Sequence, residues 1–230
     1  MPASRTYPVA WLDYLREEEG LGRHNPLFSR LALEILADFY RLGLSSPFCI
    51  VDIGGGEGGL LEALLYSGLD VRSYTILDRE PKLLEIAKSR ASNVPVSAVK
   101  LDLEALTGSP NSEVLRRSLE VDLVCMVRIL NYLPDSAVAG LQDALAASHA
   151  RAALLVIPAE LDGTEQAEQE IEFHGTTVAQ YRRPMSAYAV FLRGAGFTMI
   201  LEKSIGVEQY SGPTHRLIIA YRNEIAATTN

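Results

Sequence analysis

The stretch Val51-Asp52-Ile53-Gly54-Gly55-Gly56-Glu57-Gly58-Gly59-Leu60 places alternate glycines between an apolar run and a helix-like one. Residues 47–51 are apolar enough for a buried strand, and apolar residues recur at helical spacing over 60–65. Glycine at such a junction allows positive φ and lets a ligand approach the amides of a helix N-terminus. The stretch therefore predicts a nucleotide-binding turn between a strand and a helix.

Two motifs overlap in this turn. Gly54, Gly56 and Gly59 fit the dinucleotide pattern GxGxxG, which is a weak signal alone, and Asp52 with the glycines fits DxGxGxG. With Asp52 the turn resembles that of the class I S-adenosylmethionine-dependent methyltransferases, whose acid lies near the methionine part of the cofactor. A carboxylate there would repel a pyrophosphate. The resemblance implies S-adenosylmethionine as cofactor, bound by Asp52 and the turn glycines Gly54, Gly55, Gly56 and Gly58.

A second acid follows about 20 residues after the glycine turn. Residues 74–77 indicate a short strand that ends at Asp78, with Arg79 next to it. A carboxylate at this place accepts hydrogen bonds from ribose hydroxyls in dinucleotide enzymes and methyltransferases alike. We therefore expect Asp78 and Arg79 to bind the cofactor. The alternative is that Asp78 caps the helix that Pro81 would begin.

A third acid closes the extended run of residues 94–103. In the methyltransferases that the chain resembles, an acid at the end of the third strand receives the adenine amino group, and the amide of its neighbour meets a ring nitrogen. Asp102 and Leu103 match those places and are therefore candidate cofactor-binding residues. The alternative is a solvated acid in a loop, because Asp is common at strand ends.

The run of residues 121–135 resembles the fourth strand of that family and the loop after it, where cofactor and acceptor meet. Asn131 stands where histidine is frequent, and asparagine can orient an acceptor but cannot be its general base. Arg128 is a candidate partner for the carboxylate of the cofactor's methionine. The alternative is a surface arginine at a strand end.

The remaining elements predict the fold class. Residues 152–158 indicate a fifth buried strand, 186–196 a helix, and 197–204 and 215–221 two strands joined too closely for a crossover helix. Residues 181–197 also resemble the segment that precedes the sixth strand of the methyltransferases. We expect an α/β fold: a doubly wound, mostly parallel seven-stranded sheet with a C-terminal antiparallel hairpin and an N-terminal helical cap.

The domain organisation follows from the helical pattern before residue 47. Apolar residues mark two amphipathic pieces, at 11–15 and at 27–39. We expect residues 1–46 to form a helical lid and residues 47–230 the cofactor-binding domain, because N-terminal helices cover the cofactor in similar enzymes. Aromatic residues of the lid serve for packing, or one of them faces the sulfonium.

Composition excludes several classes of function. The 230 residues carry a formal net charge of -8 with scattered Lys and Arg, which disfavours nucleic acid as a partner. The sequence has no signal-like core, no run of about 18 apolar residues, and no clustered His and Cys, so we expect a soluble cytoplasmic protein with no membrane contact and no metal. A homodimer is left open.

The predicted reaction is transfer of the sulfonium methyl group to a small-molecule acceptor. The catalytic candidates are His174, as base or else a surface histidine, with Tyr181 and Asn131. The alternative is an enzyme of the same fold that cyclises or cleaves S-adenosylmethionine itself and releases methylthioadenosine. For that reaction Asn131 and Tyr181 would hold the cofactor's own amino group.

Overall fold

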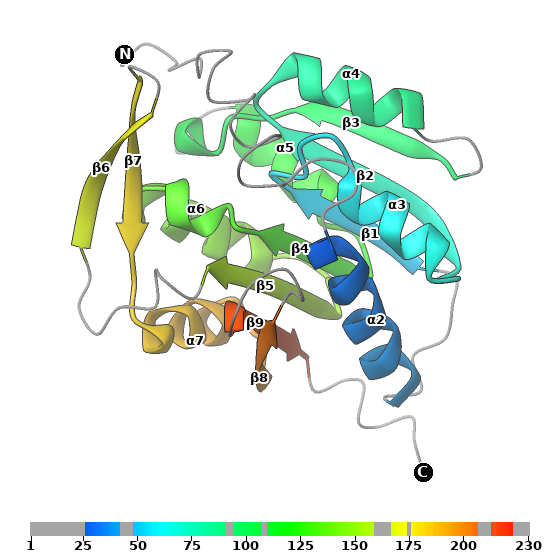
Figure 1. Cartoon of the computed structure of the whole chain (residues 1–230). Coiled ribbons are helices and arrows are strands. Elements are labelled where there is room, and N and C mark those ends of the chain that lie inside the picture. The colour runs from blue at the N-terminus through cyan, green and yellow to red at the C-terminus, as the bar shows by residue number, and fades with distance from the viewer. Residues whose placement is uncertain are drawn as a thin grey trace.

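A seven-stranded sheet forms the centre of the molecule (Figure 1). The computed structural model describes residues 26–41, 48–90, 94–106, 110–158, 167–173, 176–206 and 213–222. The strands of this sheet are β1 (Phe48–Ile53), β2 (Val71–Asp78), β3 (Val96–Lys100), β4 (Leu123–Val127), β5 (Ala152–Pro158), β8 (Met199–Gly206) and β9 (Pro213–Tyr221).

The strand order is β3-β2-β1-β4-β5-β9-β8. The first five of these strands pair in parallel, and β9 runs antiparallel to both of its neighbours, β5 and β8. The order reverses at β1, where one crossover leads to β2 on one side and a later one leads to β4 on the other. The structure thereby confirms the predicted doubly wound sheet with its C-terminal antiparallel hairpin.

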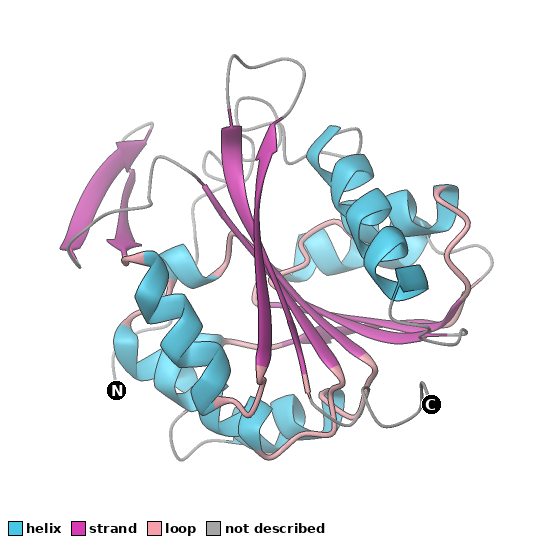
Figure 2. Cartoon of the chain, turned by 90° about the horizontal axis from the view of Figure 1, so that it is seen from below, coloured by secondary structure: helices cyan, strands magenta, loops and turns pink. Residues whose placement is uncertain are grey.

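Helices cover both faces of the sheet (Figure 2). Apolar side chains of β1 alternate between two buried clusters, with Ile50 in one and Val51 and Ile53 in the other. The first cluster includes α2 (Pro26–Arg41), α3 (Gly59–Tyr66) and α4 (Pro81–Arg90), and the second includes α5 (Pro110–Ser118), α6 (Asp135–Ala146) and α7 (Met185–Gly194). Both faces are buried, which explains the nearly continuous apolar runs of the central strands.

Helix α2 belongs to the layer that covers the sheet. Its residues Leu27, Leu31, Ile35 and Phe39 are buried in the same cluster as the strands. A β-carbon on Gly59 would come 2.7 Å from Cε2 of Phe28, so glycine is what allows α2 to approach α3 so closely. The predicted helix over 27–39 is therefore part of the main core, whereas the first amphipathic piece lies outside the described residues. The division at residue 46 stays a prediction.

A second sheet of two strands stands apart from the main one. The strands β6 (Ala167–Phe173) and β7 (Thr176–Arg182) pair in antiparallel register between β5 and α7 in the chain. The sequence indicated only a polar stretch here, because AEQEIEF has no run of apolar residues typical of a buried strand. In the part of the chain that the structure describes, no helix is both long and apolar enough to span a bilayer.

Candidate functional site

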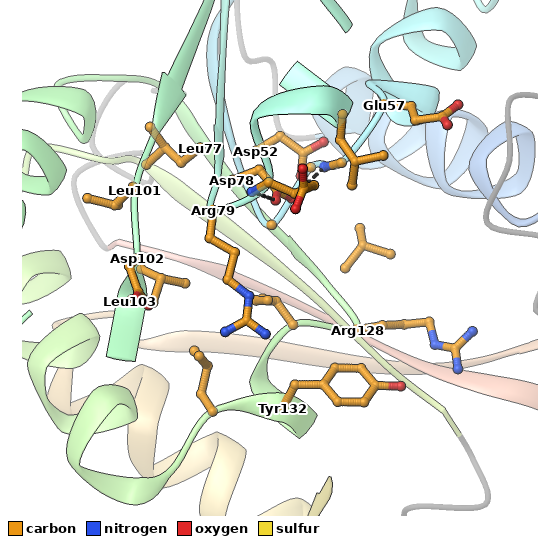
Figure 3. Close-up of a pocket in the computed structure, with 18 of the residues that line it drawn as sticks. Asp52, Glu57, Leu77, Asp78, Arg79, Leu101, Asp102, Leu103, Arg128 and Tyr132 are labelled. Carbon is orange, nitrogen blue, oxygen red and sulfur yellow. Dashed lines mark hydrogen bonds between the residues drawn. The ribbon is translucent and has the colours of Figure 1, made fainter. Parts of the chain in front are cut away.

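A cavity of about 180 Å³ opens at the carboxyl ends of β1, β2, β3 and β4 (Figure 3). This is the edge at which open parallel sheets bind ligands, next to the point where the strand order reverses. The lining residues are Phe28, Asp52, Gly54, Gly55, Gly56, Glu57, Gly59, Leu77, Asp78, Arg79, Glu80, Leu83, Leu101, Asp102, Leu103, Glu104, Val127, Arg128, Ile129, Tyr132 and Leu133.

The glycine turn between β1 and α3 has a backbone conformation that would be strained with any other residue type. Gly54, Gly56 and Gly58 have φ values of 72°, 52° and 78°. A β-carbon on Gly54 would also lie 2.8 Å from Cδ1 of Ile129, a side chain of the loop after β4. The turn therefore brings its main chain to the cavity wall. Gly58, the residue that caps α3, lies outside the cavity lining although the sequence placed it with the cofactor.

Asp52, the last polar residue of β1, is 2% exposed and lines the cavity. Its Oδ2 accepts a hydrogen bond of 2.8 Å from the hydroxyl of Tyr74, and its Oδ1 has no hydrogen-bond partner in the described part of the chain. Burial raises the pKa of the carboxyl to about 7; the Tyr74 hydrogen bond lowers this pKa and the charge of Asp78 raises it. A buried oxygen that lacks a partner costs free energy, which a cationic ligand in the cavity would recover.

Asp78 ends β2, lines the cavity and precedes α4. Its Oδ2 accepts a hydrogen bond of 3.0 Å from the amide of Gly56, and its Oδ1 accepts one of 2.9 Å from the amide of Glu80. The first bond fixes the carboxylate against the glycine turn in the cavity, and the second fixes the entry to α4. Burial raises the pKa of Asp78, and the backbone hydrogen bonds oppose that rise. Each oxygen still has accepting capacity for a ligand hydroxyl.

Asp102 and Leu103 follow β3 and also line the cavity. The Oδ1 atom of Asp102 accepts a hydrogen bond of 3.0 Å from the amide of Glu104 and so caps η1 (Leu103–Ala105). Because this cap is local, it holds the loop in place while the other carboxylate oxygen keeps its accepting capacity. Arg79, which follows β2, forms an ion pair of 3.0 Å with Glu104 of η1.

Arg128 follows β4 and is 7% exposed, so the interpretation as a surface arginine was wrong. In the described segments it is the single residue other than glycine with positive φ, at 60°, a conformation that costs about 1 kcal/mol. Its amide donates a hydrogen bond of 2.9 Å to the carbonyl of Val156. Burial and the charge of Arg128 lower the pKa of His215 on β9 to about 4. Figure 3 shows the guanidinium extending away from Asp52 and Asp78.

Of the predicted catalytic residues, the two that the structure describes, Asn131 and Tyr181, do not line the cavity. Asn131 lies in η2 (Leu130–Tyr132), fully buried, with neither amide atom hydrogen-bonded within the described residues, and it is absent from the lining. Tyr181 on β7 does not line the cavity either; its ring lies 5.2 Å from the guanidinium carbon of Arg183. His174 lies outside the described residues. Their catalytic roles stay predictions, without support from the lining.

Arg183 is a residue that the sequence pattern did not single out. It is 4% exposed, and it donates hydrogen bonds of 2.7 Å to the carbonyls of Leu130 and Leu133 and to Oδ1 of Asp135. These bonds hold the turn after β4, of which Tyr132 and Leu133 line the cavity. The paired arginines before Pro184 were the available signal, but partners about 50 residues away cannot be inferred from spacing.

The wall of the cavity is mostly apolar, and most of the charged residues in its lining are acidic. Six carboxylates line it, against two guanidinium groups, Arg79 and Arg128. The six acids are Asp52, Glu57, Asp78, Glu80, Asp102 and Glu104. In surroundings of low dielectric such a set attracts cations and repels polyanions.

No family model and no curated protein sequence matches the chain. The chain is similar in structure to the glycopeptide N-methyltransferase MtfA in complex with S-adenosylhomocysteine, with 16% identity over 81% of this chain and 87% of that one and a TM-score of 0.59. It is similar to magnesium protoporphyrin IX methyltransferase (ChlM) from Synechocystis PCC 6803 with bound S-adenosylmethionine, with 15% identity, 96% and 87% coverage and a TM-score of 0.57.

A third similar structure is an S-adenosylmethionine-dependent methyltransferase from Clostridium acetobutylicum ATCC 824, with 10% identity, 92% and 97% coverage and a TM-score of 0.61. Each of these chains is matched over most of its length at low sequence identity. The strand order and the site at the carboxyl edge agree with that likeness. The chain therefore has the fold of the class I S-adenosylmethionine-dependent methyltransferases.

Proposed function

We propose that the chain binds S-adenosylmethionine and transfers its methyl group to a small-molecule acceptor. The observation that carries this proposal is the acidic cavity beside the glycine turn. Of the two cofactor classes that use such a turn, dinucleotides bring a pyrophosphate and S-adenosylmethionine brings a sulfonium cation. Six carboxylates against two guanidinium groups favour the cation.

Asp52 supports the same choice at atomic detail. Asp52 lines the cavity, and its buried Oδ1 has no partner among the described residues. A pyrophosphate near this oxygen would add repulsion to its existing desolvation, whereas an ammonium or sulfonium group would stabilise the ionised carboxylate. The burial of Asp52 thus costs free energy when no cationic ligand is bound, and it strengthens binding when one is.

The remaining lining residues fit the other parts of the cofactor. Asp78 would accept the ribose hydroxyls, Asp102 and Leu103 would meet the adenine, and the amides of the glycine turn would face the methionine part. When bound, S-adenosylmethionine supplies a methyl group that is already activated by the positive sulfur. The protein then has to exclude water and align the nucleophile of the acceptor behind that methyl group.

The loop after β4 provides the groups for that alignment. Val127, Arg128, Tyr132 and Leu133 line the cavity, and Arg183 fixes the turn from behind through main-chain carbonyls. No histidine lines the cavity within the described residues. A neutral amine acceptor requires only orientation before attack, and a hydroxyl acceptor requires a base, for which carboxylates of the lining are the groups at hand.

Cleavage or cyclisation of the cofactor itself has less support. For that reaction the sequence analysis predicted that Asn131 and Tyr181 hold the cofactor's amino group. Neither residue lines the cavity. Asn131 and Tyr181 were also candidates for methyl transfer, but that reaction can rely on the other residues that line the cavity. We therefore keep methyl transfer as the proposed reaction.

Titration calorimetry with S-adenosylmethionine, S-adenosylhomocysteine and NADH tests the cofactor. We expect the two sulfur compounds to bind and NADH not to bind. Asp78→Ala should weaken S-adenosylhomocysteine binding at least tenfold, because two charge-assisted hydrogen bonds to ribose are lost. Asp70→Ala, an exposed aspartate before β2, is the matched control and should bind as the wild type does.

Mass spectrometry after incubation with S-adenosylmethionine alone tests the reaction class. We expect the cofactor to stay intact until an acceptor is added. Methylthioadenosine above the level of a protein-free control would contradict methyl transfer and favour cleavage. Binding of NADH without binding of either sulfur compound would overturn the proposal altogether.

A further inference from the structure

The charged residues of the cavity lining are separated by sign along the edge of the sheet. All six carboxylates lie on or shortly after β1, β2 and β3. Arg79 also lies on this side and is paired with Glu104 at 3.0 Å. The loop after β4 contributes these described residues to the lining: Val127, Arg128, Ile129, Tyr132 and Leu133. Arg128 is the single charged residue among them, so the cavity has an acidic side and a cationic side.

The Arg128 side chain extends away from the acidic side. Its amide donates a hydrogen bond of 2.9 Å to the carbonyl of Val156 on β5. Figure 3 shows the guanidinium extending away from Asp52 and Asp78. In the other direction lies His215 near the start of β9, the strand beyond β5. Burial and the charge of Arg128 lower the pKa of His215 to about 4, so the field of the guanidinium reaches β9.

We propose that Arg128 binds a carboxylate of the methyl acceptor, and that the acceptor is an apolar molecule carrying this acidic group. This inference rests on the proposed function and names the class of acceptor. Val127, Ile129 and Leu133 give this part of the lining an apolar surface, and Tyr132 adds a hydroxyl. Pockets of this kind hold an organic molecule by apolar contact and orient it by a few polar groups. A guanidinium group suits a carboxylate because it can donate two parallel hydrogen bonds.

The carboxylate of the cofactor's methionine is the other ligand that this guanidinium could bind. The methionine part is proposed to lie at Asp52 and the glycine turn, and the guanidinium extends away from Asp52 (Figure 3). Transfer of a methyl group also requires the acceptor to approach from the side opposite the sulfur, so cofactor and acceptor occupy different parts of the cavity. With the acids placed for a cationic cofactor, the part that contains Arg128 is left for the acceptor.

Burial makes Arg128 selective for charge. The residue is 7% exposed, so little water screens its interaction with an anion. Backbone geometry does not account for an arginine here, because a φ of 60° favours glycine or asparagine. A carboxylate in this part of the cavity would gain charge-assisted hydrogen bonds, which a neutral amide of the same shape would lack. We therefore expect discrimination by charge between ligands of equal shape.

The experiment compares benzoate with benzamide and phenylacetate with phenylacetamide, two pairs of similar shape and different charge. Ligand-detected NMR measures their affinities for protein saturated with S-adenosylhomocysteine. We expect each carboxylate to bind at least about tenfold more tightly than its amide. Arg128→Asn, which suits a φ of 60°, and Arg128→Gln, which is closer in length, should both remove this preference. Both should leave the affinity for S-adenosylhomocysteine within about twofold of the wild type.

Arg216→Asn is the matched control. Arg216 is next to His215 on β9, and successive side chains of a strand point to opposite faces. Its side chain is 35% exposed, donates a hydrogen bond of 2.6 Å to Oγ of Ser204 and does not line the cavity. The substitution should change neither the preference for carboxylates nor the affinity for S-adenosylhomocysteine. Every variant should still bind adenosine, which shows that it is folded.

Three results would overturn the inference about Arg128. The first is wild-type protein that binds the carboxylates no more tightly than the amides, and the second is a preference that persists in both neutral variants. The third is a tenfold weaker binding of S-adenosylhomocysteine in those variants with unchanged binding of adenosine, which would assign the guanidinium to the cofactor's carboxylate. Wild-type protein that binds neither S-adenosylhomocysteine nor adenosine would instead refute the proposed function, so the two failures are distinguishable.

Discussion

Asp52→Asn should make the protein more stable at neutral and alkaline pH. Burial raises the folded-state pKa of this carboxyl from 3.8 to about 7, so the folded protein holds the proton more tightly than the unfolded chain does. This tighter proton binding stabilises the folded protein in full below pH 4, and the stabilisation is lost as pH rises towards 7. The total loss is about 4 kcal/mol, since each pKa unit corresponds to about 1.4 kcal/mol. Asparagine is neutral throughout and avoids this loss.

Urea unfolding of the wild type and Asp52→Asn at pH 5 and pH 8 measures the effect. The free energy of unfolding of the variant relative to the wild type should increase by about 2–3 kcal/mol between the two pH values, as linkage gives for one group with these pKa values. All other titrating groups are common to both proteins, so most of their effect cancels in the comparison.

The hydrogen bond from Tyr74 offers an internal control. Its 2.8 Å contact lowers the pKa of Asp52, so Tyr74→Phe should raise that pKa and move the loss of stability to higher pH. A difference between wild type and Asp52→Asn that stays constant from pH 5 to pH 8 would refute the reasoning. It would mean that Asp52 is ionised in the folded protein throughout this range.

Two further predictions concern packing and the turn after β4. Gly59→Ala should lower the free energy of unfolding by about 1–3 kcal/mol, because the new β-carbon would lie 2.7 Å from Phe28 Cε2. Phe28→Leu in the Gly59→Ala background should recover part of the lost stability in urea unfolding. An unchanged urea midpoint for Gly59→Ala would contradict the close approach of α2 to α3. Arg183→Ala should cost about 3 kcal/mol, because it leaves main-chain carbonyls buried and unpaired. Arg193→Ala, on the exposed side of α7, is its control and should cost less than about 0.5 kcal/mol in thermal or urea unfolding.

The parallel sheet and its acids could be predicted from the sequence because the signals are local. Asp52, Asp78 and Asp102 each close a short apolar strand, and parallel strands bring their carboxyl ends to one edge. The glycine turn marks the passage from β1 into α3, the first crossover of the sheet. The cavity confirms that these three acids lie together.

Long-range contacts account for what the sequence did not predict. Arg183 donates hydrogen bonds to main-chain carbonyls 50 and 53 residues away. Because every residue has a main-chain carbonyl, the residue types at those positions do not reveal the contact. Asn131 was assigned to the acceptor site from its place after β4, but the 3-10 turn of η2 buries it and presents Tyr132 instead. The hairpin β6–β7 escaped prediction because neither strand has the continuous apolar run of the central strands, although Glu168, Glu170 and Glu172 alternate with less polar residues in β6.

The separation of that hairpin from the main sheet makes it a natural site for grafting. In the described residues β6 and β7 pair only with each other, β5 is fixed by its pairing with β9, and Arg183 anchors the chain directly after β7. Residues 167–182 can therefore be exchanged for the corresponding segment of another chain without removing a strand from the main sheet, provided that the packing of β7 against η2 is kept. Chimaeras built in this way would change the hairpin, while the pairing of β5 before it and the hydrogen bonds of Arg183 after it stay the same.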